Sequence, residues 1–196
     1  MRESTHDWST PVDHYHLRSI RSDPARYAPG GALHLLYEVV AYPADEASVL
    51  GGGRCLVAVW EDGFRVTDYG RGTATVLDET GRPVRKPVMS TEDLRFFGSS
   101  QPSRLPDGHE RRGMSVVAAL SGRLVHTNRR VEGAWTQEYR FGVPEDDLRE
   151  LQAAGCSGTT VEVRVGPELT PLPPRGRWWS AMTAHWPQLD FEFDGD

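Results

Sequence analysis

The sequence has few of the features that mark secreted, membrane-spanning or metal-binding proteins. The segment Met1–Asp7 is polar and lacks the apolar run of a signal peptide. No stretch approaches the roughly 20 apolar residues that a membrane span needs. The two cysteines, Cys55 and Cys156, lie far apart and lack metal-ligand spacing. We therefore expect a cytoplasmic protein with no membrane partner and with both thiols reduced and buried.

The sequence also has no excess of positive charge, because 28 Asp and Glu residues outnumber 22 Lys and Arg residues and the formal net charge is −6. A protein that binds DNA by neutralising phosphates normally has a basic face, so we expect no direct nucleic-acid partner. What remains is ordinary for a globular domain: 196 residues, of which 38% are hydrophobic and 26% charged. Such a chain is long enough to bury a sizeable core.

The N-terminal stretch, residues 1–21, is polar and predicts a surface arm. His14 and His16 would share one face of an extended segment, where two imidazoles are potential metal ligands. No third ligand stands nearby in the sequence. We therefore expect two exposed histidines and no metal.

Hydrophobic periodicity predicts a first helix after this arm. Its apolar residues recur at i, i+3, i+4 and i+7, at Leu33, Leu36, Tyr37 and Val40. Pro43 lacks an amide hydrogen, so it should kink or end the helix. The glycines at 51–53 close the segment.

The remaining segments favour strands. Expected strands are 56–60, 64–67, 123–130, 134–141 and 159–165, the first four forming two hairpins. Met114–Leu120 predicts a buried helix, Ser90–Asp93 a helix start, and residues 98–112 a mobile polar loop. Helices with consecutive antiparallel strands between them indicate an α+β sandwich.

Four blocks of sequence then occur in a distinctive order. They are HLLYEVV at 34–40 with DEA at 45–47, VTDYGRG at 66–72, GMSVVAALS at 113–121, and WTQEY at 135–139 with GVP at 142–144 and GTTV at 158–161. Together, over about residues 22–166, they resemble the ATP-binding domain of the DNA gyrase B subunit, actinobacterial type. Hsp90, histidine kinases and MutL belong to the same wider family. The resemblance implies a two-layer sandwich whose mixed, mainly antiparallel sheet has helices on one face and a nucleotide pocket between the layers.

The resemblance also implies roles for individual residues. Glu38 matches the general base that activates water. Asp68 matches the carboxylate that accepts a hydrogen bond from the adenine amino group, supported by Gly72 and Thr159. The candidate ligand-binding residues are Asp45, Glu46, Arg71, Gly72, Thr159 and Val116, with Arg71 and Glu46 expected to pair at the rim. Positions 38, 42, 45 and 46 share one helical face, as a pocket wall requires.

The sequence departs from the family at its metal site. Tyr42 stands where the family has the asparagine that holds Mg²⁺, one turn after its base, and Pro43 follows directly. A phenol is a poor ligand for a hard cation that requires compact octahedral oxygens. We therefore expect no metal site.

The phosphate loop departs as well. The family's glycine-rich loop aligns with Asp107–Gly113, where only Gly108 and Gly113 remain. Arg111 and Arg112 either contact phosphate by charge or belong to an exposed charged loop. We expect no cofactor, and ATP to bind weakly if at all.

Three hypotheses follow for function, and all exclude supercoiling by this chain alone. The favoured one is a metal-independent acid–base enzyme of specialised (antibiotic) metabolism, with Glu38, Asp68 and Tyr42 as its catalytic residues. The second is a non-catalytic protein that binds a gyrase-directed antibiotic or senses a nucleotide. The third is a slow ATPase. Each takes a small-molecule ligand.

The tail, residues 167–196, is first Pro-rich and then Trp-rich. Trp178, Met182 and Trp186 share one face of a helix. We expect this helix to pack on its own domain or on a second copy, which would make a homodimer; the functional alternative is an aromatic lid that closes the pocket. The expected organisation is an arm at 1–21, the pocket domain at 22–166, and this extension.

Overall fold

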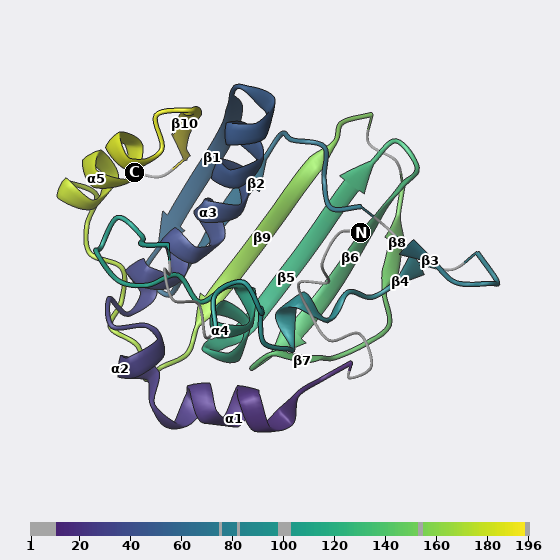
Figure 1. Cartoon of the computed structure of the whole chain (residues 1–196), viewed down its shortest axis with the longest axis horizontal. Coiled ribbons are helices and arrows are strands. Elements are labelled where there is room, and N and C mark those ends of the chain that lie inside the picture. The colour runs from purple at the N-terminus through teal and green to yellow at the C-terminus, as the bar shows by residue number, and fades with distance from the viewer. Residues whose placement is uncertain (1–10, 75, 82, 98–102, 153–154, 195–196) are drawn as a thin grey trace.

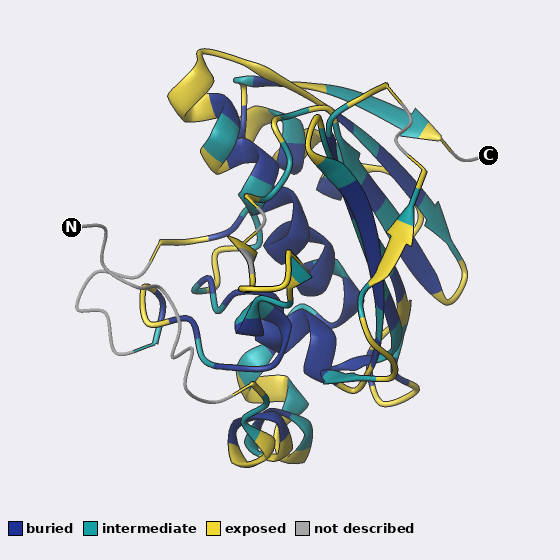
Figure 2. Cartoon of the chain, turned by 90° about the vertical axis from the view of Figure 1, so that its right-hand side faces the viewer, coloured by how far each residue is buried: buried dark blue, intermediate teal, exposed yellow. Residues whose placement is uncertain are grey.

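The computed structural model describes residues 11–74, 76–81, 83–97, 103–152 and 155–194, and it shows a sheet with helices on one face (Figure 1). The helices are α1 (His14–Ser22), α2 (Pro24–Tyr27), α3 (Ala32–Leu50), α4 (Met114–Ala119) and α5 (Arg177–His185), with a 3₁₀ turn, η1 (Pro87–Met89). Figure 2 views the two layers from the side, with the buried residues of α3 and α4 turned toward the sheet. None of the described helices is both long and apolar enough to span a membrane.

The main sheet runs in the order β10-β1-β2-β9-β5-β6-β7, with β8 paired to β6. Its strands are β1 (Gly53–Trp60), β2 (Gly63–Asp68), β5 (Ser121–Arg130), β6 (Gly133–Arg140), β7 (Val143–Pro144), β8 (Arg149–Leu151), β9 (Gly158–Val165) and β10 (Leu189–Asp194). A separate hairpin joins β3 (Val76–Leu77) and β4 (Pro83–Val84). Within the described residues, only the pairing of β1 with β10 is parallel. The expected α+β sandwich with a mixed, mainly antiparallel sheet is confirmed.

Helix α3 forms where its apolar period predicts it, but it does not end at Pro43. It continues to Leu50 and ends at Gly51, whose left-handed φ of 81° suits a residue without a side chain. Pro43 removes one backbone hydrogen bond from the helix. The buried residues Ala44 and Ala47, which follow Pro43, stabilise the helix past this point. The last turns of α3 therefore reach the pocket wall.

The expected N-terminal arm is instead partly helical. Residues 11–13 lead into α1, and the Asp13 side chain caps the helix by accepting from the His16 N–H at 2.9 Å. His16 is buried, with its Nε2 2.9 Å from Ser115 Oγ, so the expectation of two exposed histidines is wrong for His16. The helical period, which places His16, Leu17 and Ile20 on one face, explains this burial.

No helix starts at Ser90. The hydroxyl of Ser90 donates to the Gly142 carbonyl at 2.7 Å, and that of Thr91 donates to the Pro87 carbonyl at 3.0 Å. Asp93 binds Arg95. The Ser90 and Thr91 hydroxyls are therefore not available as caps, and the Asp93 carboxylate accepts from the Arg95 N–H at 3.1 Å, so the segment forms turns.

The stretch expected as a mobile loop, 98–112, is described only from residue 103. From there it folds as a tight turn, in which the N–H of Leu105 donates to the His109 carbonyl at 2.9 Å. The backbones of Arg104 and Glu110 form an isolated antiparallel β-bridge. This turn places Arg111 and Gly113 beside α3, where they matter for the site.

The tail forms helix α5 and strand β10 (Figure 1). Trp178, Met182 and Trp186 are all buried, and the Tyr37 hydroxyl donates to the Trp178 carbonyl at 3.1 Å. The helix thus packs on the domain's own α3. Strand β10 extends the sheet beyond β1, an arrangement that the sequence does not predict.

The two cysteines differ in their environments. Cys55 is buried, and burial raises the pKa of its thiol. Cys156 is exposed, which corrects the expectation that both are buried. Its position in the turn between β8 and β9 explains the exposure.

Candidate functional site

A cavity of about 550 Å³ lies between the helical layer and the sheet. Its walls come from α3, from strands β2, β9, β5 and β6, and from the segment 83–89. Of the residues expected at the site, those that line it are Tyr42, Asp45, Glu46, Asp68, Arg71, Gly72 and Thr159. A cavity of this size suits a small organic molecule.

Asp68 ends strand β2 at the cavity wall. Its Oδ1 accepts from the Gly70 N–H at 2.9 Å, and its Oδ2 accepts from the Thr159 N–H at 3.2 Å. Burial raises the pKa of Asp68, although these two N–H groups oppose the shift. The two bonds fix the carboxylate in place and leave it lone pairs for a ligand donor.

Arg71 and Glu46 form an ion pair at the rim. Arg71 Nε lies 2.7 Å from Glu46 Oε1, and the Arg71 N–H donates to the same oxygen at 3.3 Å. Gly72 follows with a left-handed φ of 71°, and a side chain there would collide with the Arg129 carbonyl. This turn brings Arg71 back over the end of α3.

Glu38 lies on the same helix but not in the cavity. It is fully buried, and its Oε2 accepts from the Gly113 N–H at 2.9 Å while its Oε1 accepts from the Arg112 N–H. Arg111 Nε is 4.0 Å from Oε2. The residue expected to be a base is therefore enclosed by the segment 111–113.

Arg111 links Glu38 to the cavity-lining residues Tyr42 and Asp45. Its guanidinium lies between the rings of Tyr42 and Phe96, 4.6 and 4.5 Å from their centroids, and donates to Asp45 Oδ2 at 2.7 Å. Tyr42 Oη accepts from the Met114 N–H at 3.2 Å, and burial raises the pKa of this phenol. Tyr42 thus contacts the cavity beside a cationic side chain.

The comparisons agree with the four sequence blocks. No protein-family model matches the chain. Over 160 residues it is 31% identical to the DNA gyrase B subunit of Mycobacterium leprae, a match that covers 78% of this chain and 24% of that protein. The gyrase B subunits of Staphylococcus aureus strain N315 and Haloferax volcanii are 30% and 32% identical over 78% and 74% of the chain. The chain resembles the ATP-binding domain of the DNA gyrase B subunit.

The gyrase B-like domain spans about a quarter of the length of these relatives. Asp68 and Arg71, both from the gyrase-like motif at residues 66–72, line one cavity. Of the expected catalytic and ligand-binding residues, two lie elsewhere, since Glu38 and Val116 are fully buried and do not line the cavity. For Val116 the reason is the burial of helix α4 on every side.

The loop of the gyrase B-like domain at the phosphate position is also altered. Gly108 is exposed at the tip of the 103–112 turn. Arg112 pairs with Glu110 at 2.8 Å, outside the cavity lining. The backbone N–H groups of Arg112 and Gly113 already donate hydrogen bonds to the Glu38 carboxylate. An anion in this place would have to compete with a buried carboxylate of the domain's own.

Sequence reasoning missed His34, one turn before Glu38. His34 is fully buried, with Nδ1 2.7 Å from Asp107 Oδ2 and Nε2 3.6 Å from Glu38 Oε1. Burial alone would lower the pKa of His34, but the hydrogen bond to Asp107 and the negative charges of Glu38 and Asp107 raise it to about 9. The i, i+4 spacing from Glu38 was the available signal. It also missed Asn128, whose side chain bonds to both the N–H and the carbonyl of Thr73, at 2.7 and 2.8 Å.

The charge on His34 predicts a pH dependence of stability. Because the folded pKa, about 9, exceeds the ordinary 6.5, the contribution is complete below pH 6.5 and is lost as the pH rises through 9. We expect the free energy of unfolding to fall by up to about 3 kcal/mol across this window. Urea titrations of the wild type and of His34→Gln would measure it. His185→Gln, at an exposed site, should keep the wild-type dependence of the unfolding free energy on pH. The same pH dependence in His34→Gln would contradict its assignment to His34.

Proposed function

We propose that this gyrase B-like domain binds a small planar ligand at Asp68 and does not hydrolyse ATP. The observation that carries the proposal is the enclosure of Glu38, whose two carboxylate oxygens accept the N–H groups of Arg112 and Gly113. A general base must come within about 3 Å of the water it activates. Glu38 has no exposed surface from which to do so.

The other requirements of hydrolysis are weakened in the same region. Tyr42 stands at the position of the expected metal ligand and contacts Arg111, so a cation there would meet a like charge. Among the described residues no three His, Cys, Asp or Glu side chains gather into a metal-binding group. The expected base is thus enclosed, and the residues at the expected metal and phosphate positions differ from those of the family.

The positions of the expected acid and base residues support ligand binding better than acid–base catalysis. Of the three residues expected to act as acid or base, Glu38 is outside the cavity and Tyr42 has a raised pKa. Asp68 remains, and its fixed carboxylate suits a ligand N–H donor. The Arg71–Glu46 pair supplies a polar rim. A gyrase-directed inhibitor or a nucleotide base has the shape and the donor that such a site requires.

Calorimetric titration tests this proposal. Adenosine serves as a planar probe with an N–H donor, and we expect MgATP to bind no more than about threefold more tightly than adenosine, since the phosphate contacts are missing. Asp68→Asn should weaken adenosine binding at least about tenfold. Asp62→Asn, which alters an exposed carboxylate on the β1–β2 turn, is the control.

Phosphate release gives the opposing result. Release from the wild type that depends on Mg²⁺ would establish a slow ATPase and overturn the proposal. Conversion of a small substrate that depends on Asp68 would instead favour the acid–base enzyme.

A further inference from the structure

The far end of the cavity lies across the sheet from Asp68. The register places Val66, Val161, His126 and Gln137 in one row across β2, β9, β5 and β6. All four line the cavity. Since neighbouring strands are about 4.8 Å apart, the β6 end is roughly 14 Å from the β2 end that carries Asp68. A ligand that fills the cavity would therefore have a second end far from Asp68.

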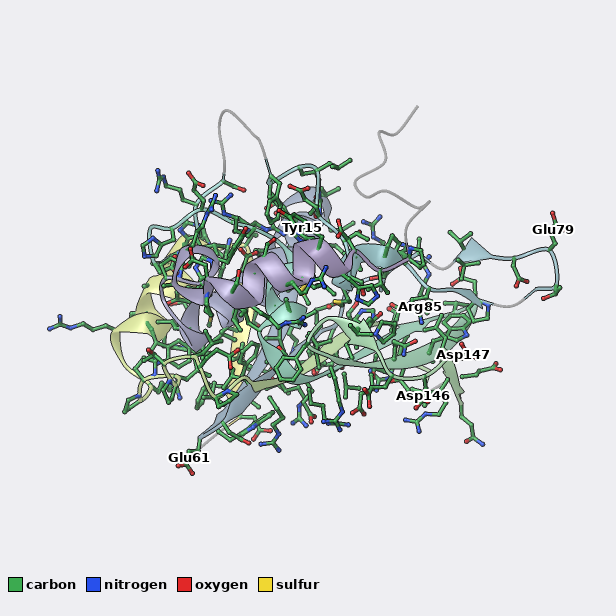
Figure 3. The ribbon with its side chains drawn as sticks, turned by 90° about the horizontal axis from the view of Figure 1, so that it is seen from below. Tyr15, Glu61, Glu79, Arg85, Asp146 and Asp147 are labelled. Atoms are coloured by element: carbon green, nitrogen blue, oxygen red, sulfur yellow. The ribbon has the colours of Figure 1, made fainter. Side chains whose placement is uncertain are left out.

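Two cations border this second end. Lys86, the only lysine in the chain, is half-buried and lines the cavity beside Arg85. Figure 3 shows the β3–β4 hairpin extending outward to Glu79, whereas Arg85 lies back over the sheet. Among the described residues, no ion pair joins Arg85 or Lys86 to a carboxylate.

The acidic side chains of the cavity do not offset these cations. Asp45 is paired with Arg111 and Glu46 with Arg71, both at the α3 wall, and Asp68 lies at the opposite, β2 end of the row. Asp146 and Asp147, at the β6–β8 end of the sheet, are exposed and do not line the cavity (Figure 3). The uncompensated charge at the second end is therefore positive.

Gln137 adds an unsatisfied acceptor at the same end. It is 2% exposed, and its Nε2 donates to the carbonyls of Glu138 and Asp146 at 3.1 and 2.6 Å, which fixes the amide orientation. Its Oε1 is then buried without a hydrogen-bond partner among the described residues. A buried acceptor in this state costs free energy until a donor reaches it.

His126 separates Gln137 from the rest of the row. Burial, followed by the charge of Lys86, lowers the pKa of His126 to about 4. Its imidazole is therefore neutral near pH 7 and can donate one hydrogen bond and accept another. Burial, followed by the positive charge of Arg130, also lowers the pKa of Lys86. An anion nearby would raise that pKa again.

We infer that Lys86, Arg85 and Gln137 form a subsite for an anionic group, a carboxylate or sulfonate, carried by an aromatic ligand with a neighbouring hydrogen-bond donor. The inference rests on the proposed function, since it names the class of ligand that the Asp68 cavity takes. Lys86 and Arg85 bind the anion, and Gln137 Oε1 accepts from the donor. The aromatic part covers the apolar floor formed by Val66 and Val161.

A matched pair of fluorescent probes tests this subsite. Anilinonaphthalene sulfonate carries an N–H and a sulfonate, and N-phenylnaphthylamine is the same molecule without the sulfonate. We expect the wild type to bind the sulfonate at least about tenfold more tightly than the neutral probe. Lys86→Met should reduce this preference, because Arg85 remains, and should leave the affinity for the neutral probe unchanged, whereas Lys86→Arg should keep the preference. Arg177→Met, at an exposed site on α5, is the control.

The outcomes separate the subsite from the cavity itself. Equal affinities of the wild type for the two probes, or a preference that Lys86→Met leaves unchanged, overturn the anionic subsite. If Asp68→Asn still weakens both probes in that case, the proposed binding function stands without the subsite. If Asp68→Asn changes neither probe, and adenosine binding is also unaffected, both proposals are wrong.

Discussion

Deleting residues 175–196 is expected to lower the free energy of unfolding by at least about 3 kcal/mol, the usual cost of truncating one buried tryptophan. The deletion removes Trp178, Met182 and Trp186 from the core. It also uncovers the hydrogen-bonding edge of β1, which pairs with β10 from Gly53 to Ala58. Urea unfolding would measure the change, and aggregation of the truncated chain is expected to accompany it.

Point variants separate packing from strand pairing. Trp178→Ala should cost about 3–5 kcal/mol and Met182→Ala about 2–5 kcal/mol, because both side chains are buried. Arg177→Ala changes an exposed residue of the same helix and should have little effect. A truncated chain that unfolds at the wild-type urea concentration would show that α5 and β10 contribute no stability.

Glu38→Gln is expected to destabilise the fold by about 3–5 kcal/mol, the range found when one partner of a buried ion pair is removed. The amide nitrogen would face an N–H donor of either Arg112 or Gly113, and Arg111 and His34 would lose a nearby negative charge. An exposed catalytic base replaced by its isosteric amide would leave stability nearly unchanged. The variant therefore distinguishes a structural carboxylate from a catalytic one.

The measurement is the urea midpoint at constant m-value. Glu46→Gln provides the control, because Glu46 pairs with the largely exposed Arg71 at the rim and its loss should cost about 1 kcal/mol or less. Equal stability of Glu38→Gln and the wild type would return Glu38 to the set of candidate bases.

Local patterns in the sequence predicted most of the elements around the site. The period of Leu33, Leu36 and Val40 locates α3, and the turns at 61–63 and 132–133 locate both hairpins. The motif around Asp68 places it and Arg71 at one cavity. Each of these features depends on residues close together in sequence.

The features that sequence reasoning missed depend on distant partners. Glu38 is enclosed by residues 111–113, and His34 is charged because Asp107 lies 2.7 Å away. Neither of these two long-range contacts has a local signal, although the i, i+4 spacing of His34 and Glu38 is one. A helical wheel gives the face of α3 but not which of its carboxylates the 103–113 turn will cover.

The parallel pairing of β1 and β10 bears on the order of folding. Gly53 pairs with Leu189 and Ala58 with Asp194, so the two strands are separated by most of the described chain. Closing so long a loop is entropically costly and is slow relative to a hairpin such as β5–β6. We therefore expect the β5–β6 hairpin to form early and β10 to dock late. During synthesis on the ribosome, β1 would remain an open edge until residues 189–194 emerge, which makes that interval the time at which the nascent chain is most prone to associate with another copy.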